Sequence, residues 1–328
     1  VPLQVDLSSE SNAYDERHTN AFKAILKLIP GPTTPNSPAI QPSEPPLRDI
    51  HYQRLLEHER IRLRHHVSQS TREALWVAQL SQLSEIGNLA DYQSLQNDIY
   101  RQMLPFAHGM TVLDIGCGQS AFACTLFTNH LYHRSHQLEA SSSPLKYVGL
   151  DQSDETLRHA DHRIGAMLRK LGLATISPSV TQSLTSSWLR FEWGDPLPFV
   201  DTSVDRILCH LSLGFVPSPL HCVREALRTL HQDGRLVMTC FQPHTDLAIP
   251  FRRHLRNTHG DELGSSAQII MHFFGRLREA VRHGILHGYE RNELARLLIH
   301  AGAGPITIVP ILDNQLLLAV VEKGKSAG

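Results

Sequence analysis

Acidic and glycine residues gather where three short apolar segments of this 328-residue chain end. The first segment, TVLDIG, contains Asp114 and runs into Gly116 and Gly118, and the next, KYVGLD, ends on Asp151. A third, LRFEWGD, ends on Asp195. Glycine lets a backbone turn sharply towards a ligand, and a following helix start offers free N–H donors. Because carboxylates at strand ends can accept hydrogen bonds from ribose hydroxyls and an exocyclic amine, the pattern predicts one nucleoside site.

Short β-branched or leucine-rich runs alternate with helical patterns after residue 109. Strands are expected at 111–116, 146–151, 189–195, 205–211, 234–241, 305–312 and 315–323, with helices between them at 154–172, 220–231 and 290–302. This alternation predicts an α/β fold, a doubly wound and mostly parallel seven-stranded sheet. Because little more than Asp313 and Asn314 separates the last two strands, we expect a C-terminal antiparallel hairpin.

These motifs resemble those of the class I S-adenosylmethionine-dependent methyltransferases, and the resemblance covers about residues 109–323. It implies a Rossmann-like fold, S-adenosyl-L-methionine as the cofactor and S-adenosyl-L-homocysteine as its product. The cofactor contacts that it implies are Asp114, Gly116, Cys117, Gly118, Asp151, Gln152, Gly194, Asp195, His210 and Leu211.

By this resemblance, the glycine turn of LDIGCG lies against the methionine part of the cofactor. Asp151 holds the ribose hydroxyls with Gln152 beside the adenine, and Asp195 accepts from the adenine amino group. The backbone around His210 and Leu211 lines the sulfonium end. Two features depart from the family. Ser120 stands where a third glycine is frequent, and the insert 130–146 is expected to be a surface loop.

The chemistry implied by the resemblance is an in-line displacement, which needs an oriented acceptor and exclusion of water more than a catalytic triad. His210 is the first candidate for orienting or deprotonating the acceptor. The alternative, that only its backbone matters, stays open. Cys209 is expected to be a small core residue.

Composition and charge disfavour several classes of acceptor, location and cofactor. The net charge of −1 and the lack of an Asn or Asp followed by two prolines and an aromatic after the fourth strand disfavour nucleic acid and protein glutamine as acceptors. No apolar run reaches the about 20 residues needed to span a bilayer. The odd number of cysteines, five without a CxxC pair, suits a reducing compartment, so a cytoplasmic location is expected. The 21 histidines show no zinc-ligand spacing, so no metal is expected.

The chain is expected to have four parts. These are an N-terminal segment with a short helix (1–28), a proline-rich linker (29–48), a helical region (49–108) and the methyltransferase core (109–323). The first two parts could serve a protein partner. Tyr92 and Tyr100 could reach the cofactor carboxylate, although packing is the expected use.

An insertion at 243–288 is expected to contribute a lid and the acceptor site. The expected acceptor is a small molecule or a carrier-bound group. Its substrate candidates are Arg252, Arg253 and Phe273. Arginines there could attract an anionic acceptor, or they could form a solvated face.

Two other functions compete. A catalytically inactive module that keeps this fold could serve assembly, but the intact polar strand ends speak against it. A nicotinamide-dependent oxidoreductase shares the acidic end of strand two, yet GCGQSA lacks the last glycine of its turn and the hairpin disfavours it.

Overall fold

The architecture comes from a computed structural model that describes Ile86 and residues 90–107, 109–135, 143–170, 184–252 and 265–323. The chain divides into two compact units, and nearly all described residues belong to the unit formed by Gln79–Arg282 and Leu286–Gly328. The segments expected at 1–28 and 29–48, and most of 49–108, lie outside the described residues.

Seven strands form one sheet. They are β1 (Thr111–Ile115), β2 (Leu145–Asp151), β3 (Leu184–Arg190), β4 (Val204–His210), β5 (Leu230–Phe241), β6 (Ile306–Ile311) and β7 (Leu316–Glu322). Their order is β3-β2-β1-β4-β5-β7-β6. The first five strands run parallel, whereas β7 is antiparallel to both β5 and β6. The expected doubly wound, mostly parallel sheet with a C-terminal hairpin is therefore confirmed.

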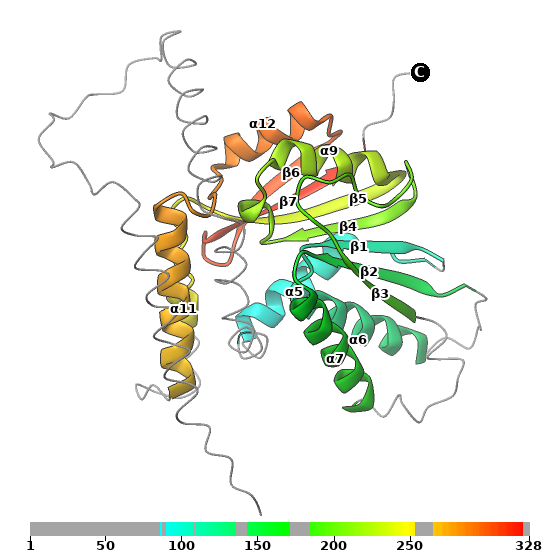
Figure 1. The fold of residues 1–328 in the computed structure, drawn as a ribbon, viewed down its shortest axis with the longest axis horizontal. Helices are drawn as coiled ribbons and strands as arrows, with labels where there is room; N and C mark the ends of the chain where they lie inside the picture. Colours follow the sequence, from blue (N-terminus) through cyan, green and yellow to red (C-terminus); the bar gives the residue numbers. More distant parts are fainter. Residues whose placement is uncertain are drawn as a thin grey trace, which may run out of the picture. The chain divides into compact units, whose positions relative to one another are not determined.

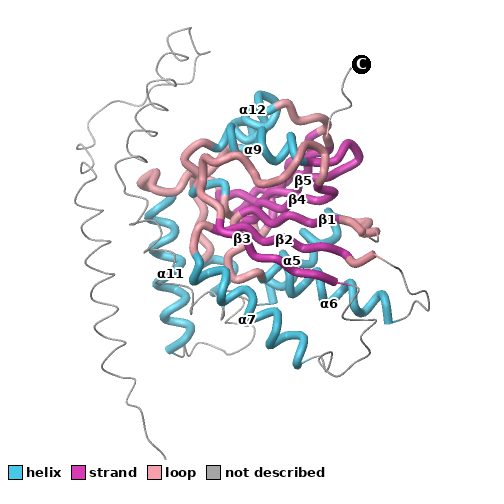
Figure 2. The backbone as a smooth tube through the Cα atoms, turned by 45° about the vertical axis from the view of Figure 1, so that its right-hand side comes forward, coloured by secondary structure: helices cyan, strands magenta, loops and turns pink. Residues whose placement is uncertain are grey.

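Helices cover both faces of this sheet. The helices of the described structure are α5 (Ala90–Met103), α6 (Ala121–Ser135), α7 (Asp154–Lys170), α9 (Pro219–Thr229), α11 (Ser265–Arg282) and α12 (Arg291–Ala301), with a 3-10 turn η1 (Leu213–Phe215). Helices α5, α6 and α7 lie on one face, and α9 and α12 lie on the other (Figures 1 and 2). The strand order reverses between β1 and β4, so the carboxyl ends of these strands are where an open α/β sheet offers a binding crevice.

The central strands are almost wholly buried because both faces are covered. Leu113, Ile115, Leu150, Ile207 and Leu236 belong to one hydrophobic core cluster and have no exposed surface. Burial on both faces explains the nearly continuous apolar runs in these strands, which a half-exposed sheet would not need. The buried strands also hold their carboxyl ends, which carry the polar residues, in fixed positions.

Three expected elements differ from the structure. The third strand is at Leu184–Arg190 rather than 189–195, so the prediction that Asp195 ends a strand is wrong. The loop expected at 130–146 is wrong in part, because α6 extends through Ser135 and β2 starts at Leu145. The fifth strand starts at Leu230, directly after α9, instead of at Gly234.

Among the described residues, no helix is long and apolar enough to cross a membrane.

Candidate functional site

The turn after β1 is built from backbone that only glycine adopts easily. Gly116 and Gly118 have φ angles of 73° and 52°, both in the left-handed region. An added Cβ at Gly116 would lie 2.4 Å from the Cβ of Ser212. The N–H groups of Gly116 and Cys117 both donate to the carbonyl oxygen of Leu150, at 2.8 and 2.9 Å. The turn is therefore fastened to the end of β2 and closely covered by the turn after β4.

Ser120 occupies the position where the family frequently has a third glycine, and it has a φ of 55°. A serine in this region is strained by about 1 to 2 kcal/mol relative to right-handed backbone. The residue is fully buried, and its N–H donates to the carbonyl oxygen of Cys117 at 2.9 Å. The chain thus keeps the backbone path of a glycine turn without the glycine.

Asp114 is a buried carboxylate that is only partly satisfied. Its Oδ2 accepts a 2.6 Å hydrogen bond from the hydroxyl of Tyr147, whereas Oδ1 is buried and has no hydrogen-bond partner. Burial raises the pKa of Asp114 to about 7, the Tyr147 hydrogen bond opposes this rise, and the charge of Asp151 adds to it. A buried acceptor oxygen without a donor is costly, so this atom suits a ligand N–H or O–H group.

Asp151 lies at the end of β2 and is 7% exposed. Its Oδ2 accepts from the N–H of Gly118 at 3.1 Å, and its Oδ1 accepts from the N–H of Ser153 at 3.0 Å. The next side chain, Gln152, has a buried Oε1 with no hydrogen-bond partner. The structure therefore brings the first two predicted carboxylates to one edge of the sheet, with unpaired acceptors beside them.

Asp195 and Gly194 lie in an exposed turn beyond β3. Asp195 forms an isolated bridge with Trp193, and Gly194 has a φ of 112°. Trp193 approaches the β1 turn, because a Cβ at Gly116 would meet its Cη2 at 3.4 Å. Although the strand was misplaced, the segment that carries Asp195 still reaches the neighbourhood of the other carboxylates.

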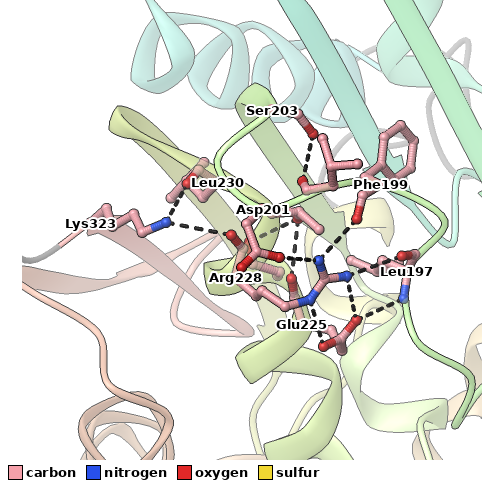
Figure 3. Close-up of polar contacts among 11 residues, drawn as sticks. Leu197, Phe199, Asp201, Ser203, Glu225, Arg228, Leu230 and Lys323 are labelled. Atoms are coloured by element: carbon pink, nitrogen blue, oxygen red, sulfur yellow. Dashed lines mark hydrogen bonds and ion pairs between the residues drawn. The ribbon is translucent and has the colours of Figure 1, made fainter.

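An ion-paired arginine holds the loop that follows Asp195 (Figure 3). Arg228 of α9 donates to the carbonyl oxygens of Leu197 and Phe199 at 3.1 and 2.9 Å. It also pairs with Asp201 at 2.7 Å and Glu225 at 2.8 Å. Glu225 closes the network by accepting from the N–H of Leu197 at 2.8 Å, and the hydrogen bonds from Arg228 lower its pKa. The loop after β3 is thereby fixed to α9.

His210 is held by both ring nitrogens. Nδ1 lies 2.6 Å from Oγ1 of Thr239, while Nε2 lies 3.0 Å from Nε2 of Gln96 and 3.3 Å from the hydroxyl of Tyr92. Burial of the ring lowers the pKa of His210 to about 4, although the residue keeps some exposed surface. A neutral imidazole whose two nitrogens are both hydrogen-bonded is a weak proton acceptor at pH 7. The same hydrogen bonds join α5 to β4 and β5.

The residues after His210 follow an unusual path. Leu211 has a φ of 56°, and its N–H donates to both oxygens of Thr239, at 3.0 and 3.1 Å. Oγ of Ser212 donates to the carbonyl oxygen of Ile115 at 2.7 Å. Left-handed backbone at a leucine costs about 1 to 3 kcal/mol and is found preferentially at functional sites. Cys209 is buried in the core, as expected from the sequence.

The predicted substrate residues do not gather in the described structure. Arg252 is exposed, Arg253 lies outside the described residues, and Phe273 is 4% exposed with its ring 5.6 Å from that of Phe274. Arg278 of α11 pairs with Asp246 at 3.0 Å. The aromatic face of α11 is therefore used for packing. Of the tyrosines, Tyr92 contacts His210, and Tyr100 lies 5.4 Å from the ring of Phe106.

Sequence reasoning missed several side chains that shape this edge. Tyr147 binds Asp114, Thr239 and Gln96 bind His210, and His287 forms a partly buried pair with Glu293. None of them is one of the acidic or glycine residues that define the predicted site. Tyr147 alone carried a signal, as a polar tip inside an apolar strand.

Comparison with known proteins places this chain in a family. A family model described as a methyltransferase domain matches residues 106–273, just over half of the chain. An uncharacterized 37.1 kDa protein in transposon TN4556 of Streptomyces fradiae is 26% identical over 245 residues. That alignment covers 72% of this chain and 54% of the other protein, so the chain spans about half the length of the curated relative that it matches.

Solved structures give a weaker likeness. An S-adenosylmethionine-dependent methyltransferase from Aquifex aeolicus is 15% identical with a TM-score of 0.44, and the match covers 74% of this chain and 96% of that one. An S-adenosylmethionine-dependent methyltransferase from Methanosarcina mazei is 16% identical with a TM-score of 0.41, covering 69% and 98%.

Proposed function

The chain belongs to the class I S-adenosylmethionine-dependent methyltransferases, and from this premise we propose that it methylates a small-molecule or carrier-bound acceptor. The observation that carries the proposal is the buried, unpaired Oδ1 of Asp114 beside the left-handed turn at Gly116 and Gly118. An empty structural turn has no need for an unsatisfied buried carboxylate, whereas a ligand with donor groups would complete it.

The residues at the strand ends fit the cofactor. We assign the methionine part to the turn of Gly116, Cys117 and Gly118, with Asp114 as an acceptor. Asp151 would hold the ribose hydroxyls. Its carboxylate already binds two backbone N–H groups, and carboxylate oxygens have further lone pairs for hydroxyl donors. The free Oε1 of Gln152 suits the adenine amino group, as does the exposed Asp195.

The chain's own contribution to the chemistry is orientation. When bound, the cofactor supplies a methyl group on a positively charged sulfur. The strained turn at Leu211 and the neutral ring of His210 would line the place where an acceptor approaches. Fixed dipoles in a dry crevice favour in-line attack over hydrolysis. We keep His210 as a cofactor-side contact and not as the proton acceptor.

The acceptor site is proposed to come from residues outside the shared core. Arg252 and Arg253 stay as candidates within the insertion 243–288, whereas the buried Phe273 is assigned to packing. Residues 1–48 stay as a candidate segment for a protein partner. All five cysteines are free thiols, which supports a reducing, cytoplasmic location.

Binding and turnover test this function separately. Isothermal titration of the purified chain with S-adenosylmethionine and with S-adenosylhomocysteine should give one site for each. Transfer of tritium from the labelled methyl group to an acceptor panel should then follow. Binding without transfer to any acceptor would favour an inactive binding module, and no binding of either compound would refute the proposal.

A further inference from the structure

The segment between α11 and α12 crosses the carboxyl ends of β4 and β5. The N–H of His287 donates to the carbonyl oxygen of Gly214 in η1 at 3.0 Å, and the N–H of Tyr289 donates to that of Phe241 at 2.7 Å. The fit is close, because a Cβ added at Gly214 would lie 2.8 Å from the carbonyl oxygen of His287. His287 is therefore on the same edge of the sheet as the cofactor residues, beside the turn that follows β4.

His287 forms a tight pair with a carboxylate. Its Nε2 lies 2.7 Å from Oε1 of Glu293, and the two side chains are 7% and 31% exposed. An ionised carboxylate only accepts hydrogen bonds, so Nε2 must carry the proton and donate it. This fixes the tautomer and leaves the lone pair on Nδ1. No described residue forms a hydrogen bond with that nitrogen.

The carboxylate of Glu293 is itself held in place. Glu293 is the third residue of α12, and its Oε2 accepts from the N–H of Glu290 in a capping box. The ring of Tyr289 packs edge-on against His287, with 4.2 Å between the centroids. Glu293 and Tyr289 are therefore titratable groups in contact with the imidazole. The ring has little freedom to turn, and its proton is directed by one partner.

Two histidines thus stand near the end of β4 in opposite states. His210 has both nitrogens engaged by Thr239 and by Gln96 with Tyr92, so it has no lone pair to offer. His287 has one nitrogen bound to a carboxylate that would stabilise an imidazolium. An oriented imidazole with a free lone pair and a carboxylate partner is the arrangement of a general base.

We propose that His287 is the general base of the methyl transfer and that Glu293 is its positioning residue. The inference rests on the proposed function, and it narrows the acceptor to a group that carries a proton on its nucleophilic atom: a hydroxyl, thiol or amine. The acceptor's lone pair forms the new bond to the methyl carbon, and the carbon–sulfur bond breaks with its electrons on sulfur. The acceptor's proton passes to Nδ1 of His287 and then to water.

The test uses the full chain and four named acceptors: catechol, benzyl mercaptan, tryptamine and benzoate. Wild-type protein should methylate at least one of the first three. His287→Gln should lower kcat for it by about 100-fold or more and remove the acid limb of the pH profile, with KM little changed. Glu293→Gln, which keeps the side-chain shape, should lower kcat less and shift the same limb.

Controls separate this inference from the function itself. Both variants should bind S-adenosylhomocysteine within about twofold of wild type, since a conserved affinity shows that the fold and the cofactor site remain intact. His300→Gln, an exposed position on the same helix α12, should match wild type in every respect. Normal kcat and pH profile in both variants would overturn the proposal. So would turnover of benzoate alone, or of none of the four acceptors, while S-adenosylhomocysteine still binds.

Discussion

The carboxyl ends of β1 and β2 and those of β4 and β5 hold their polar groups in different ways. At β1 and β2, the contacts join two adjacent strand ends through backbone: the carboxylate of Asp151 accepts from the N–H groups of Gly118 and Ser153. At β4 and β5, they join distant segments: His210 reaches Gln96, and His287 reaches Gly214. The first region is thus built by a short motif, and the second by tertiary packing of inserted segments.

This difference suggests a division of labour. The motif-built edge contains the residues that we assign to a fixed cofactor. The packed edge contains His287, which we assign to the acceptor. Loops and insertions can change without disturbing a rigid scaffold, which lets one fold serve many acceptors. The predictions below all change the motif-built edge, and they measure stability or cofactor binding.

The largest effect is expected from Gly116→Ala, which attacks the motif-built edge. The new Cβ would lie 2.4 Å from that of Ser212 on a residue with φ of 73°, so the variant should lose about 3 kcal/mol of unfolding free energy. Chemical denaturation measures this loss. Gly275→Ala in α11 is the control: no described atom lies within 4 Å, and helix propensity should raise stability by up to about 1 kcal/mol. Equal stabilities of the two variants would contradict the close packing at Gly116.

Asp151→Ala should weaken binding of S-adenosylhomocysteine by about 1 to 3 kcal/mol, because the ribose hydroxyls lose their acceptor. Isothermal titration measures the change. Asp154→Asn is the matched control, since its carboxylate is 62% exposed and pairs only at the surface with Arg190, an interaction worth about 0 to 1 kcal/mol. If both variants bind equally well, Asp151 does not hold the ribose.

Asp114 predicts a pH dependence. Its pKa is raised from 3.8 to about 7 in the folded chain. Protonation of Asp114 therefore adds to the unfolding free energy of the ligand-free chain. This contribution is complete below about pH 4 and is lost as the pH rises through 7. Affinity for S-adenosylhomocysteine, which carries an ammonium group, should rise about tenfold from pH 6 to 8 as the carboxylate ionises. Asp114→Asn should remove this slope in titrations at both pH values. If the affinity still rises with pH in this variant, another titrating group causes the pH dependence.

Ser120→Gly should have the smallest effect. Relief of strain at φ of 55° is offset by the larger conformational freedom of glycine in the unfolded chain, so unfolding free energy should change by less than about 1 kcal/mol. Denaturant titration measures it, with cofactor affinity expected to be unchanged. A loss well above that value would give the buried hydroxyl a role in this turn.

The sequence predicted the buried strands and the motif-built edge because their signals are local. Apolar runs in β1, β2, β4 and β5 reflect burial on both faces, and the two residues between the last strands indicated the hairpin. The third strand was misplaced because β3 is an edge strand. Its residues, LTSSWLR, are mostly polar and exposed, while the nearby Phe191 and Trp193 look more strand-like but lie beyond it.

The remaining errors have physical causes. The end of α6 was taken as a loop because its last six residues, HLYHRS, include one aliphatic side chain, Leu131, and no apolar stripe. The pair of His287 and Glu293 could not be predicted as part of the site, since only the path of the chain over η1 brings it to β4. Sequence reasoning selected His210 for its position after the strand, but could not see that Thr239 and Gln96 occupy both of its nitrogens.

A crystal structure of the chain with S-adenosylhomocysteine tests the central claim most directly. The account predicts the ribose hydroxyls on the carboxylate of Asp151, the amino-acid end of the ligand over the turn at Gly116, and a donor group of the ligand on Oδ1 of Asp114. Ligand bound away from the carboxyl ends of β1 and β2, or a crystal grown at saturating ligand in which those three contacts are missing, would contradict it.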